Sequence, residues 1–217
     1  MQSQSDAAPA TTQSPNKQPA PTIEFTVDHP AAPIPHYTLN LSPDTHGHYS
    51  GTQPAPTQDS STAPTEHPFD TTFNLSPQTT TRLFALADKL NRPNLTCASP
   101  AKNIASTGTK TLRLTEPGAP PIFCTYDYTE DKPLHQLTEI LQTVAETLDQ
   151  GRHLDHLHRY DRLGLDAAIL TLATEASTNP AADLTPIAPA LHSIADDPEV
   201  LQRVRTRAAA LLTTLSR

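Results

Sequence analysis

The apolar residues of this chain repeat in two different ways, and the change falls in the stretch 152–166. Before it, short runs in which apolar and polar residues alternate indicate half-buried strands, together with two runs of helical spacing. After it, apolar residues recur at every third or fourth position, as on one face of an amphipathic helix. We therefore expect an α+β fold in which a sheet precedes a helical part.

The strands are predicted to form an antiparallel sheet. Ile23, Phe25 and Val27 alternate with polar residues, and the same alternation recurs at 37–41 before the turn-forming segment 42–47. A short turn of this kind joins antiparallel neighbours, whereas parallel strands need a long crossover. Further strands are expected at 48–50, 69–75, 103–106, 109–115 and 122–128.

Two helices are predicted to cover one face of this sheet. Ser76 and Pro77 have the residue types of an N-cap and a first helical position, and the helix that they begin is expected to end near Leu90. The second helix is expected to begin after Asp131 and to end at Gly151. Each helix has an apolar stripe, which needs a partner surface, and the sheet supplies it.

The sheet domain is expected to cover 22–150, and a helical subdomain to cover 151–217 at the edge of the sheet. Short connections between successive helices favour antiparallel neighbours. Asp166 and the pair Asp197-Pro198 have the residue types that begin helices. The predicted helices of this subdomain cover 152–163, 166–177, 184–195 and 198–215.

Two segments have a composition that disfavours ordered structure. Of the 23 prolines, 12 lie in the first 68 residues, among many Gln, Ser, Thr and Ala residues. Such a mixture buries too little apolar surface to offset the entropy lost on ordering the chain. We therefore expect a disordered tail at 1–21 and a mobile loop at 52–66.

The charge balance bears on the partners of the protein. The net charge is -8, and 15 basic residues are spread among 23 acidic ones. Affinity for nucleic acid comes largely from basic residues that neutralise phosphates, so nucleic acid is not an expected partner. The sequence also has no run of about 18–20 apolar residues, so we expect no transmembrane segment.

The start of the chain favours export. Residues 1–6 lack the basic and apolar regions of a signal peptide, although a leader that had been removed would not be seen. The segment rich in Thr, Pro, Gln and Ala that follows is similar to the spacer after the leader of many exported bacterial proteins. We expect a periplasmic or secreted bacterial protein, with the cytoplasm as the alternative.

Cys97 and Cys124 permit one disulfide bond. The sequence does not show whether their Cα atoms lie within the roughly 7 Å that a disulfide requires. Cys124 falls in a predicted strand, so the alternative is a small buried apolar residue. Both interpretations stay open from the sequence.

The usual motifs of enzymes are absent from the sequence. Its 6 glycines are isolated, so neither a phosphate-binding loop nor a dinucleotide fingerprint is present. This absence favours a non-catalytic module that has a structural role or binds another protein. A hydrolase with a dispersed site is an alternative, because catalytic triads are recognised by geometry and not by chain position.

The densest group of ligand-type residues lies just after the second long helix. His153 and His156 are three positions apart and would share one helical face, with Asp149 one turn earlier. Zinc or another transition metal would need further ligands, for which His135 and His192 are the candidates. The alternative is a polar helix face without a cofactor.

Arg203 and Arg207 would share one face of the last predicted helix. Two guanidinium groups at this spacing are a candidate anion-binding pair. The alternative is that both are solvated residues of a surface helix.

Two passages, 157–166 and 191–198, resemble uncharacterised exported proteins of acidobacteria. The hairpin expected at 37–49 before a helix, and the strands at 112–128 before a second helix, are similar to small bacterial domains of unknown function. This resemblance implies strands followed by helices and implies no particular activity.

Overall fold

The structure, a computed structural model, describes residues 20–54, 66–90, 94–100, 107–178 and 182–215. The predicted disordered tail at 1–21 lies outside these residues except for its last two positions. The predicted strand at 103–106 and most of the predicted mobile loop at 52–66 also lie outside them. The described ends of that predicted loop, 52–54 and 66, are strand residues and not loop residues.

The first half of the chain forms a six-stranded sheet in the order β4-β3-β2-β1-β5-β6, and all neighbouring strands are antiparallel. The predicted α+β fold is therefore confirmed. A meander forms the first four strands, and the chain then returns to the free side of β1. The strands are β1 (Thr22–Asp28), β2 (His36–Leu41), β3 (His46–Pro54), β4 (Glu66–Asn74), β5 (Thr109–Thr115) and β6 (Ile122–Tyr126).

The two-residue period of the strands gives the sheet one buried face. Phe25 of β1 lies opposite Leu39 of β2 and Leu112 of β5, and all three side chains are buried. The opposite face is polar, since Thr26 pairs in register with Thr38 and Thr111. Successive side chains of a strand point to opposite faces, so this alternation determines which face the helices cover.

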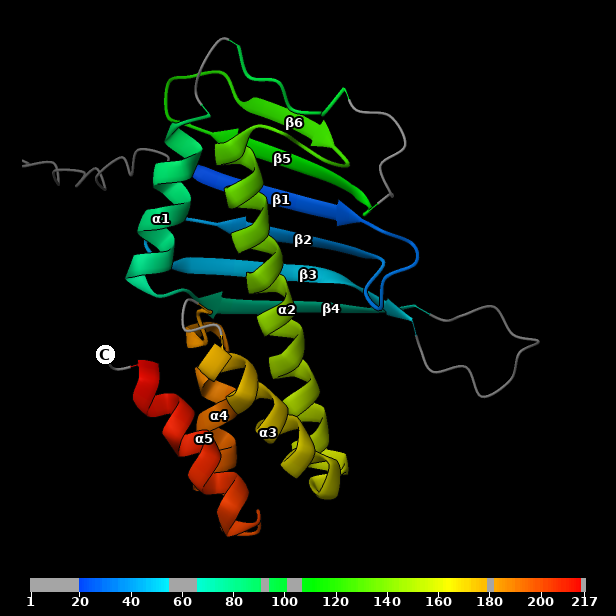
Figure 1. Ribbon diagram of the computed structural model, residues 1–217, viewed down its shortest axis with the longest axis vertical. Helices are drawn as coiled ribbons and strands as arrows, with labels where there is room; N and C mark the ends of the chain where they lie inside the picture. Colours follow the sequence, from blue (N-terminus) through cyan, green and yellow to red (C-terminus); the bar gives the residue numbers. More distant parts are fainter. Residues whose placement is uncertain (1–19, 55–65, 91–93, 101–106, 179–181, 216–217) are drawn as a thin grey trace, which may run out of the picture.

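Helices α1 (Pro77–Asp88) and α2 (Lys132–Tyr160) lie on the buried face of the sheet (Figure 1). Ser76 caps α1 by accepting a hydrogen bond from the backbone amide of Thr79, and Asp131 caps α2 through the amide of Leu134. Both N-termini therefore follow the prediction, and so does the placement of both helices on one face.

The end that was predicted for the second helix is wrong. α2 continues through Gly151 for 29 residues in total, and no separate helix begins at 152. A glycine inside a helix costs only about 1 kcal/mol, so packing can override it. Here the missing side chain admits Ile187, whose Cγ2 lies 2.3 Å from the place that a Cβ of Gly151 would occupy.

The continuation of α2 places one helix in two hydrophobic cores. Its residues up to Leu148 pack in the core of the sheet and α1, whereas Leu154 and Leu157 pack in the core of the last helices. The predicted boundary between 150 and 151 therefore falls inside a helix. In Figure 1 the lower part of α2 extends past β4 toward the helical subdomain.

The C-terminal subdomain consists of α3 (Arg162–Thr178), a 3-10 turn η1 (Thr185–Ile187), α4 (Ala188–Asp196) and α5 (Gln202–Leu215). The helix predicted for 166–177 corresponds to α3, and its predicted start at Asp166 is wrong. Asp161 lies at that N-terminus and accepts a hydrogen bond from the amide of Gly164 at 3.0 Å. Asp166 lies inside α3, and the last helix begins later than the predicted Asp197-Pro198.

Asp183 connects the helical subdomain to the edge of the sheet beside β4. Its Oδ2 accepts a hydrogen bond of 2.8 Å from the amide of Ser76, and its Oδ1 accepts one of 3.0 Å from the amide of Thr185. Burial raises the pKa of Asp183, but the hydrogen bonds from Thr185 and Ser76 outweigh burial and bring that pKa below its ordinary value. Ionised Asp183 therefore stabilises the contact.

We expect this stabilisation to disappear in acid. A carboxylate whose pKa is lower in the folded chain contributes stability above its unfolded pKa of about 4 and loses it as the pH falls through its folded pKa. At neutral pH, Asp183→Asn should lower the free energy of unfolding by about 1–2 kcal/mol. Urea denaturation should show this difference shrinking toward about pH 3. A difference that is independent of pH would contradict the assignment.

Candidate functional site

A hollow of about 610 Å³, which we name the α2 groove, lies between α2 and the connection from β1 to β2. Three hollows that share residues of α2 measure about 280, 260 and 230 Å³ and are smaller. The groove is therefore large enough for a small organic molecule or a protein side chain. Its lining residues are Val27, His29, Ala32, Pro33, Ile34, Tyr37, Thr107, Gln142, Ala145, Glu146, Asp149, Gln150 and His153.

The sequence explains both walls of the groove. The connection between β1 and β2 folds back on itself, because the amide of His29 donates to the carbonyl of Pro35 at 2.7 Å and the amide of Ala32 donates to the carbonyl of His29 at 2.8 Å. The wall from α2 consists of residues at helical spacing on one side of that helix, from 142 to 153. Ile34 and Ala145 are buried and supply apolar surface.

Asp149 is the centre of a polar cluster at the inner end of the groove. The hydroxyl of Tyr49 donates to its Oδ1 at 3.0 Å, and the guanidinium of Arg152 donates to the same oxygen at 3.2 Å. Arg152 then extends away, to Gln53 Oε1 at 2.8 Å and over the ring of Phe69 at 3.7 Å. Both hydrogen bonds end on Oδ1, so no residue that the structure describes donates to Oδ2 of Asp149.

Tyr37 presents a second oxygen without a partner. The residue is 9 % exposed, and its ring packs edge-on against Tyr49 with 5.7 Å between the centroids. No hydrogen bond of its hydroxyl is present among the described residues. Burial raises the pKa of Tyr37, and the charges of Asp149 and Glu146 raise it further. The hydroxyl is therefore protonated and lies within the field of two carboxylates.

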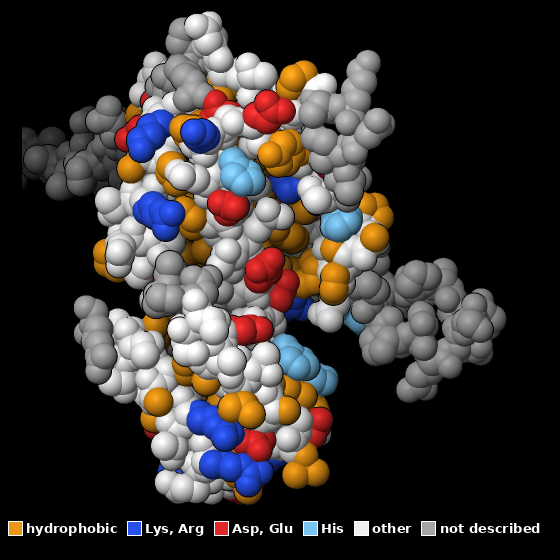
Figure 2. Space-filling model, in the orientation of Figure 1, with side chains coloured by type: hydrophobic (Ala, Val, Ile, Leu, Met, Phe, Trp, Pro, Cys, Tyr) orange, Lys and Arg blue, Asp and Glu red, His pale blue; other side chains and the backbone are white. Residues whose placement is uncertain are grey.

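The hydrogen bonds and positive charges around the carboxylates of Asp149 and Glu146 do not offset the burial of these two groups. Burial raises the pKa of Asp149 and outweighs the hydrogen bonds from Tyr49 and Arg152. Burial also raises the pKa of Glu146, and repulsion by Glu175 adds to it. Figure 2 shows acidic side chains along the middle of one face, over α2, with apolar surface beside them. The field at this place favours a cation.

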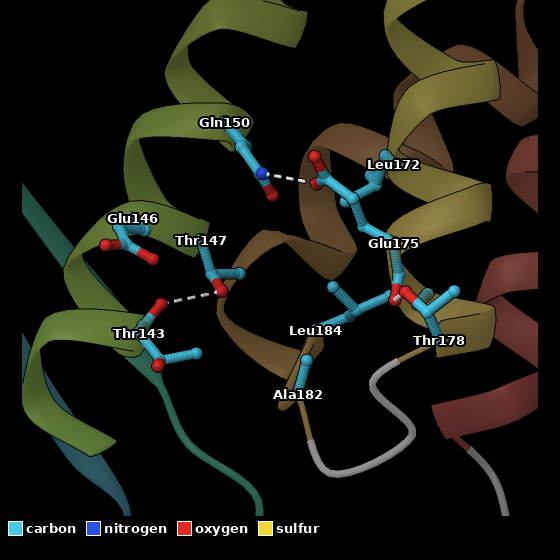
Figure 3. Close-up of a pocket in the computed structure, with 10 residues that line it drawn as sticks. Thr143, Glu146, Thr147, Gln150, Leu172, Glu175, Thr178, Ala182 and Leu184 are labelled. Carbon is cyan, nitrogen blue, oxygen red and sulfur yellow. Dashed lines mark hydrogen bonds between the residues drawn. The ribbon is translucent and has the colours of Figure 1, made fainter. Parts of the chain in front are cut away.

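A second hollow, of about 280 Å³, lies on the side of α2 that faces α3. In Figure 3, Gln150 and Glu175 point toward one another across it, and Gln150 Nε2 donates to Glu175 Oε2 at 2.8 Å. Leu172 and Leu184 supply apolar walls. Glu146 and Gln150 line this hollow and the α2 groove, so the exposed face of α2 has recesses on both sides.

The two tyrosines allow a paired prediction. Tyr49 is fully buried, so Tyr49→Phe removes a donor from Asp149 and should lower the free energy of unfolding by about 1–2 kcal/mol. Tyr37→Phe removes a hydroxyl without a partner and should change the stability by less than about 0.5 kcal/mol. Thermal unfolding of both variants checks this contrast, and equal losses would contradict the different roles assigned to the two hydroxyls.

The histidines predicted for a metal site are exposed residues of α2. His153 lies at the rim of the α2 groove, and the ring of His156 packs against Tyr160 with 5.0 Å between the centroids. Of the other predicted ligands, Asp149 accepts hydrogen bonds from Tyr49 and Arg152. Nε2 of His135 lies 3.3 Å from Oε1 of Glu139. Within the described ranges, no three His, Cys, Asp or Glu residues are gathered in a way that could hold a metal ion. A zinc site here stays a prediction.

The arginines predicted to bind an anion converge on a carboxylate of the chain itself. Nε of Arg203 donates to Oδ2 of Asp166 at 2.9 Å, and Arg207 donates to Oδ1 at 2.7 Å. The hydrogen bond from Arg203 is the largest cause of the lowered pKa of Asp166. The pair therefore joins α5 to α3. A similar contact that sequence reasoning missed joins His158 of α2 to Asp197, the residue that follows α4, at 2.8 Å.

Cys97 and Cys124 form a disulfide bond, with 5.3 Å between their Cα atoms. Cys124 is buried on β6, and Cys97 belongs to the described segment 94–100. The amide of Ser99 donates to the carbonyl of Tyr128 at 2.9 Å, so that segment lies beside the end of β6.

Sequence reasoning did not identify Tyr37, Tyr49 and Glu146 as site residues. The alternation of the sequence predicts strands for both tyrosines, and Asp149 is predicted only as a candidate metal ligand. One signal was present, because buried tyrosines need a polar partner for their hydroxyls, and these two point inward from neighbouring strands.

Two negative findings complete the description of the site. Of the helices in the described part of the chain, none has both the length and the apolarity that crossing a membrane requires. The chain matches no known protein family model and no curated protein sequence.

Proposed function

We propose that this protein is a non-catalytic interaction module, which holds a group of its partner in the α2 groove. The observation that carries this proposal is the pair of oxygens without partners, Asp149 Oδ2 and the Tyr37 hydroxyl, beside an apolar wall. Polar groups in a recess lose hydration, and a bound partner can replace it. Another protein is the partner that this proposal favours.

The lining residues favour binding over hydrolysis. Those that the structure describes include no serine or cysteine, and the one threonine, Thr107, donates its hydroxyl to the carbonyl of Asp127 at 3.2 Å. A nucleophile would need a base within hydrogen-bonding reach. The acidic groups of the groove are therefore assigned to recognition.

We also propose that the protein resides in an oxidising compartment, the periplasm or the exterior of a bacterium. The disulfide between Cys97 and Cys124 supports this location, because such bonds persist there and are reduced in most cytosols. Alkylation of thiols at the moment of lysis tests it. Protection of both cysteines is expected, and two modified cysteines would contradict the location.

A blocking substitution tests the binding function. Ala32 lines the groove, whereas its neighbour Ala31 is exposed and outside it, so Ala32→Trp and Ala31→Trp form a matched pair. Neutral, cationic and anionic fragments are titrated while amide resonances are followed. We expect some fragments to shift the amide resonances of residues 142–153 in the wild type and in Ala31→Trp. The same fragments should leave these resonances unchanged in Ala32→Trp. If no fragment of any charge shifts these residues, the proposal fails.

A further inference from the structure

Three oxygen groups face the α2 groove and accept no hydrogen bond from any described residue: Asp149 Oδ2, the carboxylate of Glu146 and the hydroxyl of Tyr37. Tyr37 is the decisive one, because it is nine-tenths buried and yet has no partner. Among the described residues no fully buried side-chain oxygen lacks a partner, so the hydroxyl of Tyr37 keeps access to the groove although most of the side chain is buried. The hydroxyl is therefore available to a group that enters the groove.

We propose that the α2 groove binds a primary ammonium group on an aliphatic stem. This inference rests on the proposed function and specifies its ligand. An ammonium has three N–H donors and no acceptor; ionised carboxylates only accept hydrogen bonds, and the hydroxyl oxygen of a tyrosine can accept one although its O–H also donates. Within the described part of the chain, the cationic side chain that contacts Asp149 is that of Arg152, and it is already engaged with Oδ1 of Asp149, with Gln53 and with Phe69.

The apolar wall of the groove supplies the place for the stem. Val27, Ile34 and Ala145 are buried residues that line the groove. A chain of methylene groups gains roughly 0.8 kcal/mol for each group that it buries against such a surface. Lysine combines this stem with an ammonium, and so does a simple alkylamine. Anions are disfavoured by the same carboxylates.

Three probes separate the parts of this recognition. Nα-acetyl-lysine N-methylamide carries the ammonium and a backbone, n-pentylamine carries the ammonium alone, and Nα-acetyl-norleucine N-methylamide has the stem without the charge. Binding is measured by titration of the amide resonances of the full chain. We expect the norleucine derivative to bind at least about tenfold more weakly than the lysine derivative, the factor that 1.4 kcal/mol represents.

Matched variants assign the effect to the groove. Glu146→Gln and Glu139→Gln remove the same charge from α2, but only Glu146 lines the groove. We expect Glu146→Gln to weaken the lysine derivative about tenfold and Glu139→Gln to weaken it less than twofold. Tyr37→Phe should also weaken the binding of the lysine derivative severalfold without lowering the melting temperature. A hydroxyl with a merely structural role would show the opposite pattern.

The outcomes distinguish this inference from the function on which it rests. Stronger binding of the lysine derivative than of pentylamine would identify a protein side chain as the source, and equal binding would identify a free amine. If the norleucine derivative binds as strongly as the lysine derivative, or if Glu146→Gln and Glu139→Gln have equal effects, the ammonium site is wrong. The proposal that the groove binds a partner would then stand with a neutral group as the ligand. If no probe or fragment perturbs the groove, both proposals fail.

Discussion

Gly151→Leu is expected to disrupt the junction between the two cores and to lower the free energy of unfolding by about 3 kcal/mol. Even a Cβ at this position would lie 2.3 Å from Cγ2 of Ile187, which is 3 % exposed and belongs to η1. The helix itself would gain about 1 kcal/mol from losing a glycine, so the clash determines the sign. Urea denaturation followed by circular dichroism measures the effect.

A double-mutant cycle isolates the contact. Gly151→Ala should destabilise the wild type, but in an Ile187→Ala background the nearest atom is a Cβ at 3.1 Å and the same change should cost at least about 1 kcal/mol less. Gly164→Ala is the control, because its closest neighbour, at 2.5 Å, is a carboxylate oxygen of the exposed Asp161, which can move. If alanine stabilises both positions equally, α2 does not pack against η1 as described.

Removal of the disulfide is expected to have the other large effect. Cys97 and Cys124 are 27 positions apart, and a cross-link over a loop of this length stabilises a fold by about 3–4 kcal/mol in the chain-entropy model. The double change Cys97→Ala with Cys124→Ala should therefore lower the free energy of unfolding by that amount. Denaturation of the wild type with and without a reductant gives the same comparison without mutation.

The double variant supplies the control for that comparison, since a reductant should not change its stability. If the wild type in reductant remains as stable as the oxidised protein, the bond does not stabilise the fold. Such a result would also weaken the argument for an oxidising compartment.

The sheet and its helices were predictable because their signals are local. The alternation of Ile23, Phe25 and Val27 is visible within one strand, and all three residues are buried on the face that the helices cover. Ser76 and Asp131 begin their helices as expected, because an N-cap bonds to an amide only three residues away.

The predictions that failed depended on contacts between distant residues. Gly151 resembles a helix terminator until Ile187 is known to occupy the space beside it. Asp166 also has the residue type of an N-cap, but α3 begins four residues earlier, where Asp161 accepts from the amide of Gly164, and Asp166 pairs with Arg203 and Arg207 instead. At Gly151 tertiary packing overrides the local preference.

The α2 groove was not predictable for the same reason. The hydrogen bond from Tyr49 to Asp149 joins residues 100 positions apart, and Tyr37 lies still farther from Asp149 along the chain. Only the placement of α2 across β2 and β3 brings these groups together. The histidine cluster is recognisable in the sequence because its residues are close along the chain, whereas the acidic groove is assembled from separate elements.

The central claim is that the α2 groove binds an ammonium group between Asp149, Glu146 and Tyr37. Intermolecular nuclear Overhauser effects between Nα-acetyl-lysine N-methylamide and the protein test it most directly. We predict cross-peaks from the ε-methylene protons of the ligand to the ring protons of Tyr37. Cross-peaks from these protons only to residues outside the groove, such as the exposed ring of Tyr160, would contradict the account.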